Sequence, residues 1–218
     1  MNEIFPGVFR LDNKLWTQNK VPGVRVYGEK LLNQNGIEYR NWNPYKSKLA
    51  AGIEKGLKQF PIEKNSSVLY LGSAEGTTAS HLSDILIEGV IVGVEFSSRS
   101  MPKFLELCGQ RENMIPVLAD ANQPGQYPLE IQKTIFDVLF QDISQKNQAE
   151  IFLKNSELLK KNGFGFLVIK APSIDSAKNA ETVVTEQTKQ LKPAFDIIQT
   201  VSLEPFESKH ALILAKKK

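Results

Sequence analysis

Short apolar runs alternate with longer amphipathic stretches along most of this chain. The run at 90–94, Val-Ile-Val-Gly-Val, is hydrophobic at almost every position, which is typical of a parallel strand that helices cover on both faces. The pattern predicts strands at 67–71, 90–95, 115–119, 135–140 and 164–169 and helices near 77–87, 100–110, 147–161 and 176–191. Strands that alternate with helices indicate an α/β fold with a doubly wound sheet.

The N-terminal part of the chain departs from this alternation. Short strands are expected there at 8–11, 24–27 and 37–40. Asn35-Gly36 is a favourable hairpin turn because both residues tolerate a positive φ. A helix is expected to start near Ser47 and to run to Leu57. We therefore expect a small β-rich subdomain over residues 1–45.

The C-terminal part differs in another way. The apolar segments 195–201 and 211–215 have no helix between them, so they are expected to pair as an antiparallel hairpin. This hairpin would complete the sheet of a doubly wound domain over residues 46–218.

Composition restricts the classes of protein that fit. The chain has 218 residues, of which 41% are hydrophobic and 23% charged, as in ordinary globular proteins. Cys108 is the single cysteine, which excludes an intrachain disulfide and suits a reducing cytoplasm. With only two histidines, far apart in sequence, no metal site is expected. No apolar run is long enough for a membrane span, and the first residues do not form a secretion signal.

Charge is unevenly distributed along the sequence. The net charge is +5 over residues 1–62, −4 over 63–120 and +2 over 121–218. A basic N-terminal third beside an acidic centre would suit a polyanion that touches one face of the molecule. An ordinary solvated surface explains the same charges equally well.

The most informative motif follows the strand expected at 67–71. Residues 72–78 read Gly-Ser-Ala-Glu-Gly-Thr-Thr, so that Gly72 and Gly76 stand in a turn that opens a helix. Such a turn lets the backbone approach a ligand closely. The spacing Gly-x-x-x-Gly differs from the Gly-x-Gly-x-x-Gly of dinucleotide sites. It therefore favours another nucleoside cofactor over a nicotinamide or a flavin.

Acidic residues follow the next three strands of the predicted sheet. Glu95 could accept hydrogen bonds from two ribose hydroxyls, and Phe96 could cover an adenine face. Asp120 could accept from the adenine amino group, and Asp142 follows the fourth strand. Because ligands bind at the carboxyl ends of strands in open α/β sheets, these side chains are expected to surround one cofactor.

These motifs resemble those of the fibrillarin family of S-adenosylmethionine-dependent methyltransferases. The resemblance rests first on the cofactor motifs at 72–78, 95–96, 120–122 and 142–148. It extends to Val-Tyr-Gly-Glu-Lys at 26–30, Tyr-Arg-Asn-Trp-Asn-Pro at 39–44, Lys-Ser-Lys-Leu-Ala-Ala at 46–51, Arg-Glu-Asn at 111–113, Lys-Ala-Pro-Ser-Ile-Asp at 170–175 and Glu-Pro-Phe at 204–206 with His210.

The resemblance implies a function and a set of partners. The chain would be the catalytic subunit of a box C/D ribonucleoprotein that methylates ribose 2′-hydroxyls of ribosomal and transfer RNA. Its partners would be a guide RNA, a Nop-domain scaffold protein and a kink-turn-binding ribosomal-protein homologue. The arginine/glycine-rich extension of eukaryotic members is missing, so the chain is similar to the archaeal, cytoplasmic form. The sheet would have seven strands, with the last one antiparallel.

The family motifs also imply which residues contact the cofactor. Besides the turn glycines Gly72 and Gly76, the implied contacts are Thr77, Thr78, Glu95, Phe96, Asp120, Ala121, Asp142, Ile143, Ser144 and Gln145.

Methyl transfer to a hydroxyl needs a group that takes up the hydroxyl proton. A lysine can do so only if its pKa falls well below about 10.4, and two lysines that converge on one site would lower each other's pKa. By resemblance, Lys48, Asp142, Lys170 and His210 form the catalytic set. Glu204 is an alternative to His210 for the fourth role. His81 is expected to be a packing or capping residue.

Three positions depart from the family pattern. Pro172 stands where arginine is usual, Lys146 where proline is usual, and Glu75 where a small residue is usual. They affect RNA or partner contacts more than the cofactor site.

Two other hypotheses about the function compete with that of an RNA methyltransferase. One is a catalytically inactive, cofactor-binding structural subunit of the same particle. The other is a methyltransferase for a protein or small-molecule acceptor, since this fold hosts many acceptors.

Overall fold

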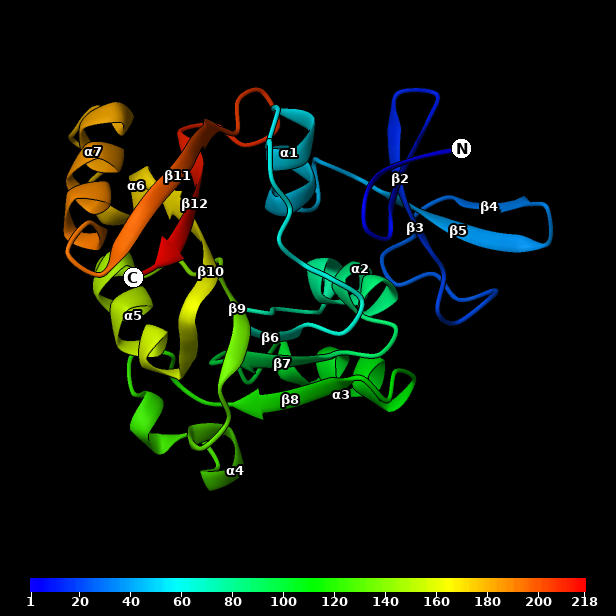
Figure 1. Cartoon of the computed structure of the whole chain (residues 1–218), viewed down its shortest axis with the longest axis horizontal. Coiled ribbons are helices and arrows are strands. Elements are labelled where there is room, and N and C mark those ends of the chain that lie inside the picture. The colour runs from blue at the N-terminus through cyan, green and yellow to red at the C-terminus, as the bar shows by residue number, and fades with distance from the viewer.

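The computed structural model describes all residues, 1–218, and contains two separate β-sheets. The N-terminal sheet has five antiparallel strands in the order β1-β2-β3-β5-β4. It projects from one side of the molecule (Figure 1). Its strands are β1 (Asn2–Phe5), β2 (Val8–Leu11), β3 (Lys14–Gln18), β4 (Leu31–Gln34) and β5 (Ile37–Trp42).

The second sheet has seven strands in the order β11-β12-β10-β9-β6-β7-β8. β12 runs opposite to the other six strands, so the predicted doubly wound sheet with an antiparallel last strand is confirmed. The strands are β6 (Ser67–Leu71), β7 (Val90–Glu95), β8 (Met114–Leu118), β9 (Phe136–Gln141), β10 (Leu159–Lys170), β11 (Phe195–Ser202) and β12 (His210–Lys217).

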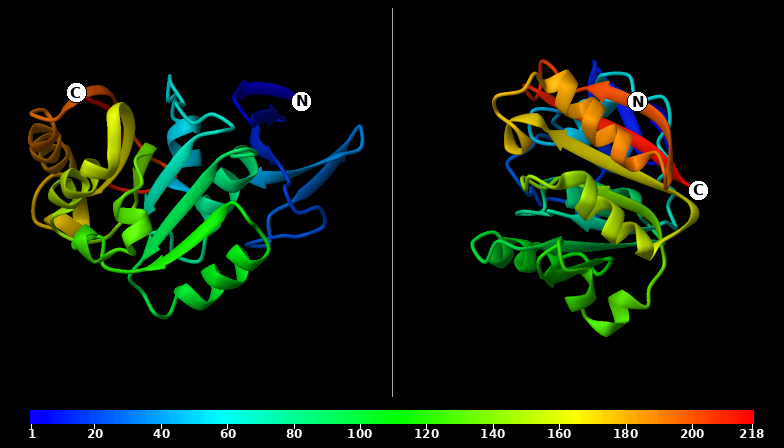
Figure 2. Two further views of the ribbon diagram at one scale, coloured as in Figure 1. Left: turned by 60° about the horizontal axis from the view of Figure 1, so that its bottom comes forward. Right: turned by 90° about the vertical axis from the view of Figure 1, so that its left-hand side faces the viewer.

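Helices cover both faces of this sheet (Figure 2). One hydrophobic core lies under α1 (Lys48–Glu54), α2 (Thr77–Ile85) and α3 (Met101–Gly109). The core on the other face lies under α4 (Leu129–Gln132), α5 (Gln148–Asn155) and α7 (Ala180–Leu191). Short elements complete the chain: α6 (Ala171–Ile174) and the 3-10 helices Pro124–Gln126 and Ser156–Leu158. No helix is both long enough and apolar enough for a membrane crossing.

Most predicted elements are confirmed, and the errors have local causes. The strand predicted at 24–27 is wrong, because the Glu29 carboxylate accepts hydrogen bonds from the Val26 and Tyr27 N–H groups and bends the chain into a turn. The helix predicted at 147–161 ends at Asn155, and β10 begins as early as Leu159. Strands β1, β3 and β4 and helices α4 and α6 were not predicted.

A network of buried charges joins the N-terminal sheet to α2, a helix that covers the second sheet. Arg40 on β5 lies 3.1 Å from Glu29 and 3.1 Å from Asp84 on α2. Arg111 reaches the other Asp84 oxygen at 2.7 Å, and all four side chains are fully buried. Because two positive charges face two negative ones, the network is neutral, as an interior with little water requires.

A histidine extends this network. The Thr17 hydroxyl donates to Asp84, so it accepts from Nδ1–H of His81. The His81 ring stacks on Trp42 at 5.1 Å between centroids. Burial, together with the Arg40 and Arg111 charges, holds the pKa of His81 well below its usual value, so the ring is neutral. His81 is a packing residue, as expected.

This network predicts a large effect of one substitution. Asp84→Asn leaves Arg40 and Arg111 without their shared carboxylate, so the free energy of unfolding should fall by about 3–5 kcal/mol. Denaturant unfolding measures the loss. The matched control is Glu88→Gln, which breaks the exposed Lys64–Glu88 pair and should cost less than about 1 kcal/mol. Equal effects of both substitutions would contradict the role given to Asp84.

Candidate functional site

The candidate site lies where the strand order reverses, between β6 and β9. A cleft of about 460 Å³ opens there at the carboxyl ends of the parallel strands. Eight of the predicted cofactor residues line it: Gly72, Glu95, Phe96, Ala121, Asp142, Ile143, Ser144 and Gln145. Its other lining residues are Ala74, Val94, Ala119 and Lys170.

The floor of the cleft depends on a glycine. Gly72 has a φ of 83°, which disfavours a side chain, and a Cβ at this position would lie 2.6 Å from the carbonyl oxygen of Asp142. Gly72 therefore lets the turns after β6 and β9 approach each other. Gly76 also has a positive φ, 91°, and packs against α3, so it shapes the turn from outside the cleft.

Glu95 is held at the end of β7 by its own surroundings. One carboxylate oxygen accepts from Ala74 N–H at 2.7 Å and the other from Ser97 N–H at 2.7 Å. Two fixed backbone donors orient the carboxylate, and its remaining acceptor capacity is available to a ligand in the cleft. Phe96 follows at the rim with 69% of its surface exposed.

Polar atoms without partners lie in the same cleft. Gln145 donates to Asp120 at 3.4 Å, but its buried Oε1 has no hydrogen-bond partner. A buried acceptor without a donor is costly, and this one belongs to a side chain that lines the cleft. Asp120 itself does not line the cleft; its neighbours Ala119 and Ala121 do.

Thr77 and Thr78 also lie outside the cleft. The Thr78 hydroxyl donates to Ser47 Oγ at 3.0 Å, and Ser47 is the N-cap of α1. Thr78 therefore fixes the start of the helix that carries Lys48. Thr77 faces a separate hollow beside α3.

Three of the predicted catalytic residues meet at one edge of the cleft. Asp142 Oδ1 lies 2.7 Å from Lys170 Nζ, and Asp142 Oδ2 lies 3.2 Å from Lys48 Nζ. Lys170 also donates to Ser144 Oγ at 3.1 Å. The three charged side chains are only 11–18% exposed, so the cluster is recessed.

The charge state of Lys48 differs from the expectation. Burial disfavours its ammonium, but the carboxylates of Asp142 and Glu207 outweigh that effect and raise the pKa of Lys48 above its usual value. The prediction that the two lysines lower each other's pKa is therefore wrong for Lys48, because Asp142 lies between them. Lys48 stays protonated at neutral pH.

A carboxylate that was not predicted lies next to the Lys48–Asp142–Lys170 cluster. Glu207 lies 3.5 Å from Lys48 Nζ. His210 is opposite Lys170 in the β10–β12 register, but its Nδ1 lies 2.6 Å from the Ser208 carbonyl in its own loop. Glu204 accepts from Lys209 N–H at 2.8 Å. The sequence did offer a signal for Glu207, because the segment Glu-Pro-Phe-Glu at 204–207 contains a second carboxylate close to Glu204.

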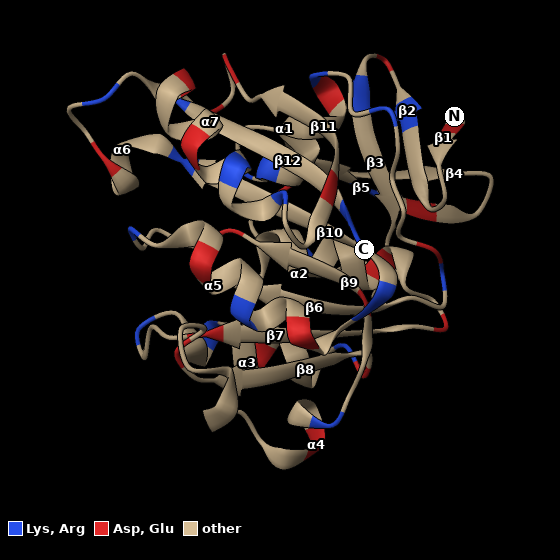
Figure 3. Cartoon of the chain, turned by 60° about the vertical axis from the view of Figure 1, so that its left-hand side comes forward, with Lys and Arg blue, Asp and Glu red and all other residues tan.

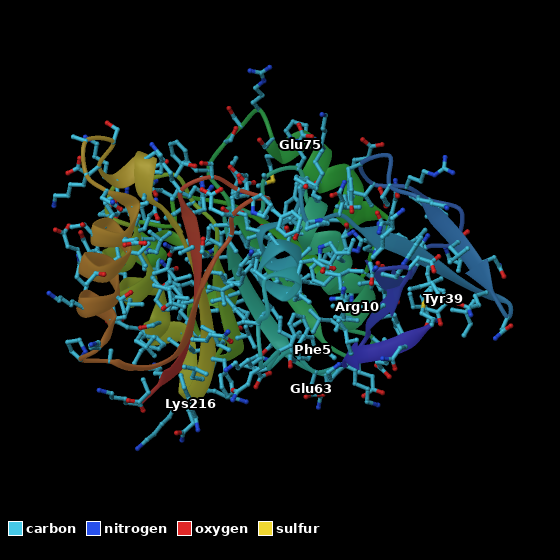
Figure 4. All side chains as sticks on the ribbon, turned by 90° about the horizontal axis from the view of Figure 1, so that it is seen from above. Phe5, Arg10, Tyr39, Glu63, Glu75 and Lys216 are labelled. Carbon is cyan, nitrogen blue, oxygen red and sulfur yellow. The ribbon has the colours of Figure 1, made fainter.

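The three unusual positions lie at the margin of the site. Glu75 is on the outside of the glycine turn, where it pairs with Lys103 at 2.8 Å (Figure 4). Lys146 is exposed in the loop after β9, and Pro172 lies in the first turn of α6, where its missing N–H costs no hydrogen bond. None of them blocks the cleft.

Comparison with known proteins agrees with this geometry. The family model described as Fibrillarin matches residues 1–218. A "Fibrillarin-like rRNA/tRNA 2'-O-methyltransferase" from Pyrococcus abyssi is 46% identical over 98% of this chain and 96% of its own. The structure of Aeropyrum pernix fibrillarin with natively bound S-adenosyl-L-methionine is 40% identical, with a TM-score of 0.85 over 95% of this chain and 92% of that one. A fibrillarin/Nop5p complex matches at 39% identity and a TM-score of 0.89 over 100% of both chains.

The close approach at Gly72 gives a testable result. Gly72→Ala places a Cβ against Asp142 O at a positive φ, so the free energy of unfolding should fall by about 1–3 kcal/mol. The control is Gly109→Ala in α3, where a Cβ meets nothing within 4 Å and alanine should be neutral or stabilising by up to about 1 kcal/mol. Thermal and denaturant unfolding measure both. An unchanged stability for Gly72→Ala would refute the packing described here.

Proposed function

The chain belongs to the fibrillarin family, and from that premise we propose that it transfers a methyl group from S-adenosylmethionine to ribose 2′-hydroxyls of ribosomal and transfer RNA. One observation carries the proposal: a recessed Lys48–Asp142–Lys170 cluster opens onto a cleft at the switch point of the sheet. The cleft would hold the methyl donor, and the cluster would receive the acceptor hydroxyl.

The residues of the cleft suit this cofactor. The oriented Glu95 carboxylate can accept from the two ribose hydroxyls, and Phe96 offers a flat apolar face to adenine. Gln145, together with Ile143 and Ser144, lines the same cleft. The glycine turn leaves room for the methionine end. When bound, S-adenosylmethionine supplies a methyl group activated by a positively charged sulfur.

Acceptor alignment and proton removal fall to the cluster. Positioning two reacting groups can lower a barrier by about 7–11 kcal/mol, and a general base adds roughly 10²–10⁴-fold. We assign the base role to Lys170, whose Nζ is oriented by Asp142 and Ser144. Lys48 stays charged and holds Asp142 in place.

Target selection is assigned to partners. Residues of both signs are interspersed along the ribbon (Figure 3). The fibrillarin that is 39% identical to this chain is in complex with Nop5p in its structure. This supports a Nop-domain scaffold protein as a partner. We further propose a box C/D guide RNA that selects the ribose by base pairing and a kink-turn-binding protein that anchors this RNA. This particle would work in an archaeal cytoplasm.

Reconstitution tests the proposed function. The chain alone should bind S-adenosylmethionine in calorimetry but methylate RNA poorly. With a box C/D guide, the Nop-domain protein and the kink-turn-binding protein, one guide-selected ribose should be methylated.

Lys170→Ala should keep cofactor binding and lower the single-turnover rate by about 10²–10⁴-fold. Efficient methylation without a guide would contradict the role of the partners, and cofactor binding without any transfer would indicate a structural subunit.

The Glu207–Lys48 pair gives a sharper test of the cluster. Glu207→Gln removes one of the two carboxylates that raise the pKa of Lys48, so any loss of activity at alkaline pH should begin at a lower pH. The rate at neutral pH should fall by about two- to fivefold, the size of one partly exposed ion pair.

Glu204→Gln is the matched control in the same loop. Glu204 does not contact Lys48, so its pH profile should overlay that of the wild type. If the pH profiles of activity were identical for Glu207→Gln and Glu204→Gln, Glu207 would have no role in controlling the charge of Lys48.

A further inference from the structure

The exposed aromatic side chains of this protein flank the catalytic cluster. Only two aromatic rings are largely exposed: Phe96, at 69%, and Tyr45, at 61%. Phe96 lines the cofactor cleft together with Asp142 and Lys170. Tyr45 precedes Lys48 by three residues, so its Cα lies within about 11 Å of that of Lys48. One exposed ring therefore serves the cofactor, and the other lies near the cluster without an assigned partner.

Tyr45 belongs to a pair of rings tied to the cluster. Its ring meets that of Phe206 edge to face, with centroids 5.0 Å apart and an interplanar angle of 74°. Phe206 directly precedes Glu207, whose carboxylate lies 3.5 Å from Lys48 Nζ. The ion pair and the ring contact thus hold the same two segments together, one on each side of the catalytic edge.

The backbone around both rings is fixed by hydrogen bonds. Tyr45 N–H donates to the Asn43 side chain at 2.9 Å, and Phe206 N–H donates to the Leu203 carbonyl at 2.9 Å. Rings held in place lose little entropy when a ligand stacks on them.

The pair borders a hollow that is separate from the cofactor cleft. This hollow has a volume of about 440 Å³, and none of its lining residues lines the cofactor cleft. Only three of its nine lining residues are hydrophobic, and three are asparagines: Asn13, Asn41 and Asn43. Side-chain amides both donate and accept, as the edges of nucleobases do. Asn41 uses one donor on the Leu15 carbonyl and Asn43 accepts from Tyr45 N–H, and their remaining donors and acceptors stay available. Lys14 and Glu54 place one charge of each sign at the hollow, and Glu54 pairs with Arg10 at 3.1 Å.

We propose that this hollow binds a nucleoside of the target RNA, with its base stacked on Tyr45 and its edge facing the asparagine amides. This inference rests on the proposed function and names the place of its substrate. Flat rings beside amides and a lysine are the chemistry that recognises unstacked bases. A peptide or a second protein would favour a more apolar lining.

The recessed cluster gives a physical reason for such a site. Its charged side chains are only 11–18% exposed, so the acceptor ribose has to enter a recess to bring its hydroxyl to Lys170. A base pulled out of its stack loses contacts that a protein surface has to replace. The Tyr45–Phe206 pair lies where it can replace them.

Substitution of Tyr45 in the reconstituted particle tests the proposal. Tyr45→Leu keeps an apolar side chain but removes the flat ring, so the KM for target RNA should rise about tenfold, while cofactor affinity stays unchanged. Tyr45→Phe keeps the ring and should behave like the wild type. The control is Ile87→Ala, which removes an exposed side chain close before the amino end of β7 and should leave KM unchanged.

A cross-linking experiment identifies the occupant directly. Target RNA with 5-iodouracil at the methylated nucleotide or at either neighbour should cross-link to the peptide containing Tyr45 or Phe206, and Tyr45→Leu should reduce the yield. A Tyr45→Leu particle with wild-type KM and cross-links elsewhere would overturn the proposal.

The remaining outcomes are also distinct. A loss of scaffold-protein binding without RNA would overturn the proposal in favour of a protein interface, and a loss of cofactor affinity would make Tyr45 a supporting residue of the fold. A wild-type particle that transfers no methyl group would instead reject the proposed function, and the nucleoside site with it.

Discussion

The carboxylate of Asp84 is the point on which the relative position of the two sheets depends. It accepts hydrogen bonds or ion pairs from Arg40, Arg111 and Thr17 and from the backbone N–H of Lys20, all within 3.1 Å. Arg40 lies on β5, and α1 begins six residues after that strand ends. The connection is short, so anchoring β5 to α2 also determines where Lys48 can reach. A buried charge network whose members do not line the cleft thus helps to place Lys48.

A second constraint acts at the cleft itself. Gly72 permits the turns after β6 and β9 to approach, and this approach brings Asp142 to the edge where Lys48 and Lys170 converge. One carboxylate between two ammonium groups neutralises only part of their charge, and Glu207 completes the balance at Lys48. The site is therefore assembled from four segments that lie far apart in the sequence. Each of them is fixed by its own backbone contacts.

Sequence patterns predicted the sheet well and the site in part. The strands at 67–71 and 90–95 could be predicted to the residue because apolar runs ending at glycine or acidic residues mark buried parallel strands. The bend at 24–27 could not, since it depends on the Glu29 side chain and not on periodicity. Family motifs predicted that Lys48, Asp142 and Lys170 meet, whereas the contact of Glu207 with Lys48 became evident only from the structure. Sequence spacing alone does not tell which of two carboxylates in a loop turns inward.

The position of β12 bears on how the protein is made. The last strand of the chain lies between β10 and β11, so the sheet has a gap until residues up to Lys217 have left the ribosome. The loop that carries Phe206 and Glu207 is anchored at its far end by this same strand. A nascent chain can bury much of its core earlier, but its catalytic edge is completed last. A chain that ends before β12 therefore lacks both the strand between β10 and β11 and the anchor of the loop that carries Glu207.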